Sequence, residues 1–169
     1  AYVEEARKAQ LKWQRTLKKE SFTQVPGEAM SQGLLIKTLN DAAQPGDSIV
    51  AAAGSPVGDL LKIWDVTNDR RALLEFGFSC MGWELPAAIG TRMSQPKGEV
   101  YVFIGDGGYL MNPMELVTAM QEDLKVTIVV ADNHGFQVIR RLQMWRTGRS
   151  FGNELRKRDR KSKRLDGDY

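Results

Sequence analysis

Short apolar runs alternate with amphipathic segments along most of the chain. The runs have few polar positions, whereas the segments between them space apolar residues three and four apart, as one face of a helix does. These patterns predict strands at residues 48–54, 71–77, 99–105 and 125–132, and helices within residues 1–20, 28–43, 55–66, 83–94, 112–123 and 135–145. Strands that are apolar throughout are typical of a covered parallel sheet. The sequence therefore predicts a single-domain α/β fold, with a parallel sheet and helices on both faces.

Pro26 and Gly27 separate a charged N-terminal helix from the sheet-forming part of the chain. We expect a linker helix from a preceding domain at residues 1–25, the sheet domain at 26–145 and a basic tail at 146–169. The tail has little apolar surface to order it, so we expect it to be mobile in a free monomer. Because the chain opens within a helical pattern and without methionine, we also expect a piece of a longer protein.

Composition narrows the class of protein. The chain has 169 residues, of which 42% are hydrophobic and 27% charged, enough for one soluble domain with a core. The sequence has no apolar run long enough to span a membrane and no signal-peptide pattern at its start. Cys80 is the only cysteine, which excludes an internal disulfide and favours the cytoplasm.

Much of the net charge of +3 comes from the stretch that begins at Arg140. A basic tail can bind nucleic acid, so an α/β interaction module with an RNA-binding tail is one alternative. The basic residues are interleaved with Glu154 and Asp159, and no nucleic-acid fold motif accompanies them. A solvated or partner-covering segment is therefore favoured over a nucleic-acid-binding one.

Glycine and polar residues follow the predicted strands. Gly54, Asp106 and Asp132 each fall at a strand end, and such ends share the edge of a parallel sheet where ligands bind. Asp106 lies in the turn "GDGG" at residues 105–108. Glycine turns between a strand and a helix usually hold phosphate. However, the dinucleotide fingerprint fails at Leu110, and no Walker lysine follows.

A divalent cation would explain a carboxylate in a phosphate-binding turn. Mg²⁺ takes oxygen ligands and commonly joins one or two carboxylates to substrate phosphates. One crossover unit after Asp106, the chain offers the amide oxygen of Asn133 and the backbone carbonyl of Gly135. Alone, a Gly-Asp-Gly turn can be an ordinary turn, and Asn133 can cap a helix. Their placement at two strand ends favours the metal.

Together, "GDGG" and the later "DN" at residues 132–133 resemble the signature of thiamine-diphosphate-dependent enzymes, in their C-terminal diphosphate-binding domain. Residues 77–108 are similar to acetolactate synthases and related decarboxylases. The finer motifs "GDGGYLMNPMELVTAMQ", "DNHGF", "SFGNELR" and "RLDGDY" resemble the C–C hydrolases of inositol catabolism that open a cyclic diketone. The resemblance covers about residues 25–169 and implies this hydrolase activity and the thiamine-diphosphate-binding fold. An acetolactate-synthase-like enzyme or a 2-oxo acid decarboxylase is the alternative.

The resemblance implies thiamine diphosphate and Mg²⁺ as cofactors. The implied metal ligands are Asp106, Asn133 and the Gly135 carbonyl, and the implied cofactor-binding residues are Gly54, Ser55, Ser79, Cys80, Met81, Gly105, Gly107, Gly108, His134 and Phe136. Backbone N–H groups of Gly107, Gly108 and Phe136 would contact the diphosphate, which the loop at residues 54–55 would reach from the other side. Met81 would be the apolar wedge that bends the cofactor, and the Ser79 carbonyl and Met81 N–H would meet its aminopyrimidine.

Two positions depart from the family pattern. Asp132 replaces the first Asn of the usual pair, and Gly108 replaces a frequent Ser, but neither change removes a metal ligand. His134 has three open interpretations: a proton shuttle, a diphosphate contact or an exposed turn residue. Cys80 is expected to pack beside the wedge.

Members of this family activate the cofactor with a glutamate from a separate pyrimidine-binding domain on another subunit. No such domain is recognised in the 169 residues. We therefore expect a homodimer or homotetramer in the full-length enzyme, a small-molecule substrate, and no turnover by this chain alone.

Overall fold

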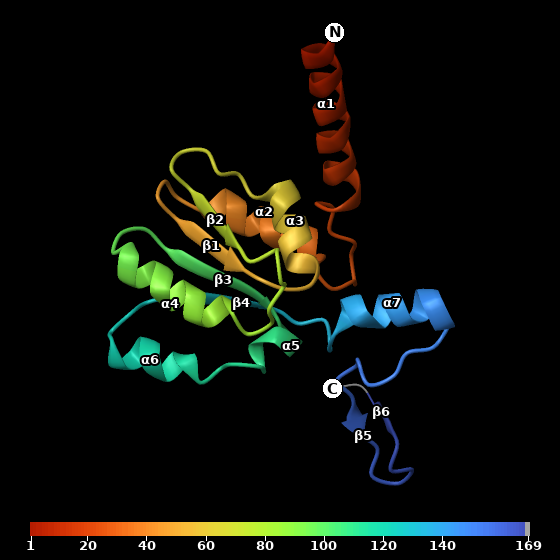
Figure 1. Cartoon of the computed structure of the whole chain (residues 1–169). Coiled ribbons are helices and arrows are strands. Elements are labelled where there is room, and N and C mark those ends of the chain that lie inside the picture. The colour runs from red at the N-terminus through yellow and green to blue at the C-terminus, as the bar shows by residue number, and fades with distance from the viewer. Residues whose placement is uncertain (168–169) are drawn as a thin grey trace.

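Four parallel strands form the centre of the computed structural model, which describes residues 1–167 (Figure 1). The strands are β1 (Ser48–Ala51), β2 (Arg71–Leu74), β3 (Val100–Gly105) and β4 (Thr127–Ala131), in the sheet order β2-β1-β3-β4. The helices are α1 (Tyr2–Glu20), α2 (Gln32–Ala42), α3 (Ser55–Ile63), α4 (Glu84–Ser94), α5 (Asp106–Tyr109), α6 (Glu115–Gln121) and α7 (Gln137–Thr147). The predicted α/β fold with a parallel sheet is confirmed.

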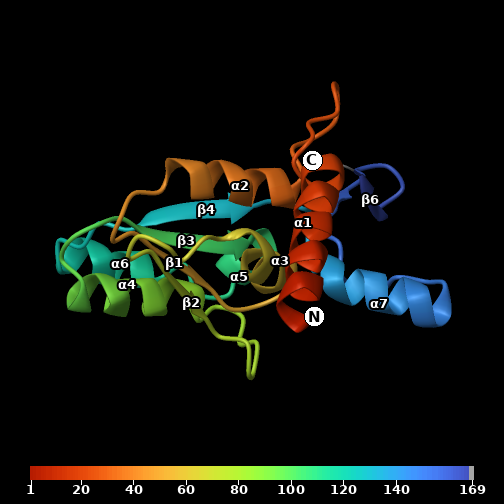
Figure 2. The same cartoon turned by 90° about the horizontal axis from the view of Figure 1, so that it is seen from above.

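Helices cover both faces of the sheet (Figure 2). Successive side chains of a strand point to opposite faces. Val50 therefore joins α4 and α6 in one core cluster, while its neighbours Ile49 and Ala51 join α2 and α3 in the other. In β3, Val102 packs on the first side and Phe103 on the second, and both are fully buried. Burial on both faces explains why these strands have so few polar positions.

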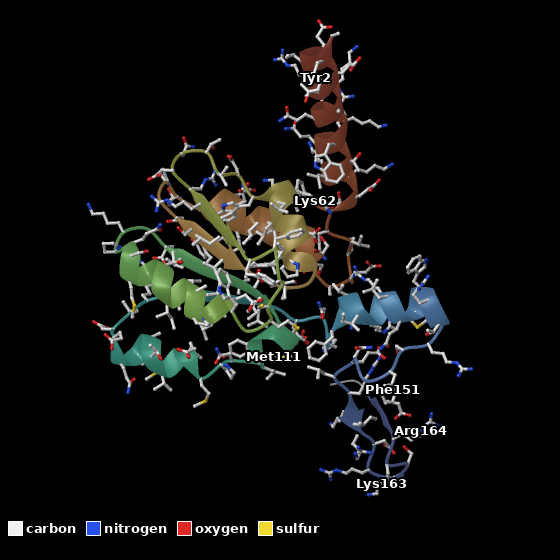
Figure 3. All side chains as sticks on the ribbon, viewed as in Figure 1. Tyr2, Lys62, Met111, Phe151, Lys163 and Arg164 are labelled. Atoms are coloured by element: carbon white, nitrogen blue, oxygen red, sulfur yellow. The ribbon has the colours of Figure 1, made fainter. Side chains whose placement is uncertain are left out.

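Helix α1 extends away from the sheet, and Figure 3 shows Tyr2 at its far end. Leu17 is the one buried residue of this helix, whereas Leu11 and Trp13 are exposed. Nowhere in residues 1–167 does a helix combine the length and the apolar character needed to cross a membrane. The assignment of residues 1–25 as a linker from a preceding domain stays a prediction.

Helix boundaries differ from the prediction at two places. Helix α2 begins later than predicted, because the hydroxyl of Ser31 caps it by accepting a backbone N–H. Asn112, the first residue of the range predicted for the next helix, is of a type that often caps helices, but it does not cap this one. Helix α6 begins at Glu115, and the Asn112 amide instead donates to the Gly82 carbonyl at 3.5 Å. Residues 106–109 form the additional helix α5, which is too short to show a periodic pattern.

The segment after α7 returns to the loop that follows β4. Within it, β5 (Lys157–Arg158) and β6 (Leu165–Gly167) form an antiparallel hairpin. Glu154 forms an isolated antiparallel bridge with Gly135 of that loop. The tail at residues 146–169 is predicted to be mobile in a free monomer, and this stays a prediction. Residues 168 and 169 of the tail lie outside the described range.

Candidate functional site

A cavity of about 220 Å³ lies beyond the carboxyl ends of β1, β3 and β4. Strand β2 is on one side of β1, and β3 and β4 are on the other. Open α/β sheets bind ligands where the strand order switches in this way. Most of the predicted site residues line the cavity, namely Gly54, Ser55, Ser79, Met81, Gly105, Asp106, Gly107, Gly108, Asn133, Gly135 and Phe136. Segments far apart in the sequence thus meet at the predicted edge.

Asp106 is the first residue of α5 and is 9% exposed. Its Oδ2 accepts a hydrogen bond of 2.7 Å from the Gly135 N–H. Its Oδ1 is buried and has no hydrogen-bond partner among residues 1–167. A buried carboxylate oxygen without a partner is costly unless a cation binds it. This atom therefore fits the predicted Mg²⁺.

The other donors at the cavity also suit a hard cation. Asn133 and Gly135 line the same cavity as Asp106 and offer an amide oxygen and a carbonyl oxygen. In the described part of the chain, no cluster of three His, Cys, Asp or Glu side chains could hold a metal by itself. Mg²⁺ commonly uses one or two carboxylates and completes its shell with water and substrate phosphates. The residues therefore fit Mg²⁺ that is bound together with a diphosphate.

Two glycines let α5 pack closely against its neighbours. A Cβ at Gly107 would lie 2.7 Å from a carbon of the Phe136 ring. A Cβ at Gly108 would lie 3.1 Å from Cγ1 of Ile104. Bare backbone consequently lines the cavity at both positions, as phosphate binding by backbone N–H groups requires.

The start of α7 differs from the expectation in its backbone donors. The Phe136 N–H, expected to contact the diphosphate, donates to the Asn153 carbonyl at 2.7 Å. The first N–H groups of a helix have no partner within the helix, and Val138 and Ile139 of the first turn of α7 also line the cavity. The N–H groups of Val138 and Ile139 are therefore better placed than that of Phe136 to donate to a ligand in the cavity. The sequence does not indicate Val138 and Ile139 as site residues, because apolar residues of an amphipathic helix are expected to face the core.

The turn before α4 brings Ser79 and Met81 to the cavity. Glu84, the first residue of α4, lines the cavity as well, although only 2% of it is exposed. Burial raises the pKa of the Glu84 carboxyl, and hydrogen bonds from backbone N–H groups, including those of Gly82 and Ala53, oppose this shift. The sequence does not indicate Glu84 as a cavity residue, because a glutamate in the first turn of a helix is usually exposed.

Cys80 and His134 are not among the residues that line the cavity, and both are exposed. The Oδ1 of Asp132 accepts the backbone N–H of His134 at 3.0 Å and lies 3.5 Å from its Nδ1. The carboxylate of Asp132 therefore stabilises the backbone of the loop after β4. The functional role of His134 stays a prediction.

Comparisons with known proteins identify the family of the chain. Residues 52–165 match the family described as thiamine pyrophosphate enzyme, C-terminal TPP binding domain. Similar proteins include the 3D-(3,5/4)-trihydroxycyclohexane-1,2-dione hydrolases of Bacillus thuringiensis (strain Al Hakam) and Bacillus anthracis (strain A0248), each 40% identical over 141 residues. The 3D-(3,5/4)-trihydroxycyclohexane-1,2-dione hydrolase of Bacillus cereus (strain AH820) is also 40% identical over 141 residues.

Each of these alignments covers 83% of this chain but 22% of the relative. The chain therefore spans less than a quarter of the length of the curated relatives it matches. The matched family range contains the cavity residues from Ala53 to Ile139. The chain belongs to the thiamine pyrophosphate enzyme family, as a C-terminal domain that binds thiamine pyrophosphate (thiamine diphosphate).

Proposed function

We propose that this chain is the cofactor-binding domain of a thiamine-diphosphate-dependent C–C hydrolase that opens a cyclic diketone in inositol catabolism. The names of the relatives support the substrate class. The observation that carries the proposal is the buried Oδ1 of Asp106. It has no partner among the described residues and belongs to a cavity shared with Asn133 and Gly135.

In this proposal, Asp106, Asn133 and the Gly135 carbonyl would hold Mg²⁺, which reconciles a carboxylate with a neighbouring diphosphate. The bare backbone at Gly107 and Gly108 would contact diphosphate oxygens. When bound, thiamine diphosphate supplies the electron sink for breaking a C–C bond beside a carbonyl. The chain itself binds this group, orients it and shields one side of it from water.

We expect another domain or subunit to complete the site. Ligand pockets usually enclose about 300–1,000 Å³, whereas this cavity measures about 220 Å³. Leu110, Met111 and Met114, between α5 and α6, are exposed large apolar side chains, and Figure 3 shows Met111 beside α5. Exposed apolar side chains that lie close together support a homodimer or homotetramer of the full-length enzyme. The single cysteine of the 169-residue chain supports a cytoplasmic location.

An assay of the full-length enzyme tests the proposal. Ring opening of the cyclic diketone is measured beside decarboxylation of pyruvate, each with and without thiamine diphosphate and Mg²⁺. Ring opening that requires both cofactors is the expected result. Decarboxylation of pyruvate without ring opening would favour the acetolactate-synthase-like alternative. Salt-sensitive RNA binding without cofactor binding would favour the interaction module.

A further inference from the structure

Two glutamates contact the backbone of the turn between β2 and α4 from opposite ends. We propose that Glu75 and Glu84 are positioning residues that hold residues 79–82 at the cofactor cavity. The inference rests on the proposed function, because in that function the Ser79 carbonyl and the Met81 N–H meet the aminopyrimidine of the cofactor.

Glu75 holds the first half of the turn. Its backbone N–H donates to the carbonyl of Ala51 at 3.1 Å, which anchors the residue beside β1. Its Oε1 accepts the Phe78 N–H and its Oε2 accepts the Cys80 N–H, each at 2.7 Å. These hydrogen bonds, first the one from Phe78, lower the pKa of Glu75. Both carboxylate oxygens are therefore engaged by the turn.

Glu84, which lines the cavity, holds the second half of the turn. Its Oε2 accepts the Gly82 N–H at 2.9 Å. The backbone N–H groups of Ala52 and Ala53, which directly precede Gly54, also lower the pKa of this carboxyl and so lie on its side of the loop after β1. One buried carboxylate thus joins the turn to the loop after β1. Both segments contribute residues to the cavity lining.

The turn has a conformation that its sequence alone does not favour. Ser79 has a φ of 53°, in the left-handed region that non-glycine residues rarely adopt. Gly82 has a φ of 86°, and a Cβ there would lie 3.2 Å from the Cβ of Met111. Hydrogen bonds from side chains to the backbone are what keep such a conformation in place. The two glutamates supply three of them.

The turn adds little to the hydrophobic core. Phe78 is 89% exposed, Met81 is 38% exposed, and Ser79 and Cys80 are exposed as well. The hydrogen bonds of Glu75 therefore fix the position of a surface turn and do not support core packing. What they determine is where the Ser79 carbonyl and the Met81 backbone lie relative to Asp106 and Gly107 across the cavity.

The experiment compares two ligands in the full-length enzyme. Magnesium thiamine diphosphate and magnesium pyrophosphate are titrated by calorimetry into wild type, Glu75→Gln and Glu84→Gln. Both ligands share the metal and diphosphate contacts, and only the first has a pyrimidine ring for the turn to contact. Each variant should weaken thiamine diphosphate about tenfold, as expected for a lost or misplaced hydrogen bond. Pyrophosphate affinity should change less than about twofold, because its contacts lie away from the turn.

Asp159→Asn is the matched control. The Oδ1 of Asp159 accepts two backbone N–H groups, those of Lys161 and Ser162, and Asp159 does not line the cavity. Its variant should leave both affinities unchanged. Glu75 lies on an exposed turn, so Glu75→Gln keeps the test decisive even if the buried Glu84→Gln fails to fold.

Equal losses for both ligands, or no loss for either, would overturn the positioning role. The proposed function fails in a different place, in the wild-type titration. Wild type that binds no thiamine diphosphate in the presence of Mg²⁺ would end both proposals, whatever the variants do.

Discussion

The backbone N–H of Gly135 donates a 2.7 Å hydrogen bond to Oδ2 of Asp106 and so joins the loop after β4 to the start of α5. The other carboxylate oxygen of Asp106 is buried without a partner in residues 1–167. The carboxylate is therefore oriented by the protein before any metal binds. Pre-orientation of this kind lowers the cost of forming a metal site.

We expect Asp106→Ala to abolish Mg²⁺-dependent binding of thiamine diphosphate, because the metal loses its anionic ligand and the diphosphate its bridge. Calorimetric titration of the full-length enzyme, with and without Mg²⁺, measures this. Asp132→Asn is the control, since it keeps an oxygen that can accept the His134 N–H, and it should bind like wild type. Unchanged affinity in Asp106→Ala would reject the metal role.

Gly107→Ala should weaken both folding and cofactor binding. The new Cβ would lie 2.7 Å from the Phe136 ring, and overpacking of this kind typically costs about 1–3 kcal/mol. Urea unfolding measures the stability, and calorimetry measures the affinity. Gly90→Ala on α4 is the control, because a Cβ there meets no atom within 4 Å. That variant should be neutral or more stable by up to about 1 kcal/mol. Equal behaviour of the two variants would contradict the prediction.

The tail should divide into two parts in hydrogen exchange. The N–H groups of Phe136 and Leu155 are hydrogen-bonded to the Asn153 and His134 carbonyls and should exchange slowly. The hairpin at residues 157–167 is mostly exposed and should exchange fast in the isolated chain. We propose that the hairpin forms part of a lid over the cofactor, so its exchange should slow in the full-length enzyme with cofactor. Fast exchange of the hairpin in every state would contradict the lid.

Attachment of the tail should depend on pH through Glu154. Its hydrogen bond with Arg156, together with the charge of Arg140 on α7, holds the pKa of Glu154 below its usual 4.5. A carboxylate with a lowered pKa stabilises the folded arrangement above its unfolded value and loses this effect as the pH falls through its folded value. The NMR amide signals of Phe136 and Leu155 should therefore shift at acidic pH.

Glu154→Gln is the comparison for that titration. At neutral pH, the amide signals of Phe136 and Leu155 in this variant should already resemble those of the wild type at acidic pH. They should change little on acidification. If the variant showed the same titration curve as the wild type, the pH dependence would belong to a group other than Glu154.

The isolated 169-residue chain should show no turnover of the cyclic diketone or of pyruvate. We expect the glutamate that activates the cofactor to come from a different domain. Weak, Mg²⁺-dependent binding of thiamine diphosphate should remain, because the metal and diphosphate contacts lie within the chain. Steady-state assays of the pure chain measure the first expectation and calorimetry the second. Measurable turnover of either substrate would show that the division of the site between domains is wrong.

The sequence predicts the sheet well because its signal is strong. Buried residues such as Val50, Val102 and Phe103 need apolar side chains on both faces, which leaves short apolar runs that are typical of a covered parallel sheet. The shared cavity follows from the same logic, since Asp106 and Asn133 fall at strand ends and strand ends of a parallel sheet coincide.

What the sequence does not reveal depends on contacts between distant segments. Glu75 and Glu84 look like ordinary surface glutamates until the turn they share is folded. Asn112 has the right type and place for a helix cap, yet its amide is engaged by the Gly82 carbonyl. The Phe136 N–H is likewise occupied by Asn153, from a segment whose contacts no local pattern reports.

The bridge between Gly135 and Glu154 also bears on how this domain can be excised. A Cβ at Gly135 would lie 2.2 Å from the Asn153 carbonyl oxygen, so the loop after β4 and residues 153–155 fit each other closely. A recombinant chain stopped at the end of α7 would leave the Phe136 N–H without its acceptor and would uncover buried Gly135. The shortest version that retains the native loop after β4 should therefore extend at least to Leu155, whether or not the hairpin beyond it is kept.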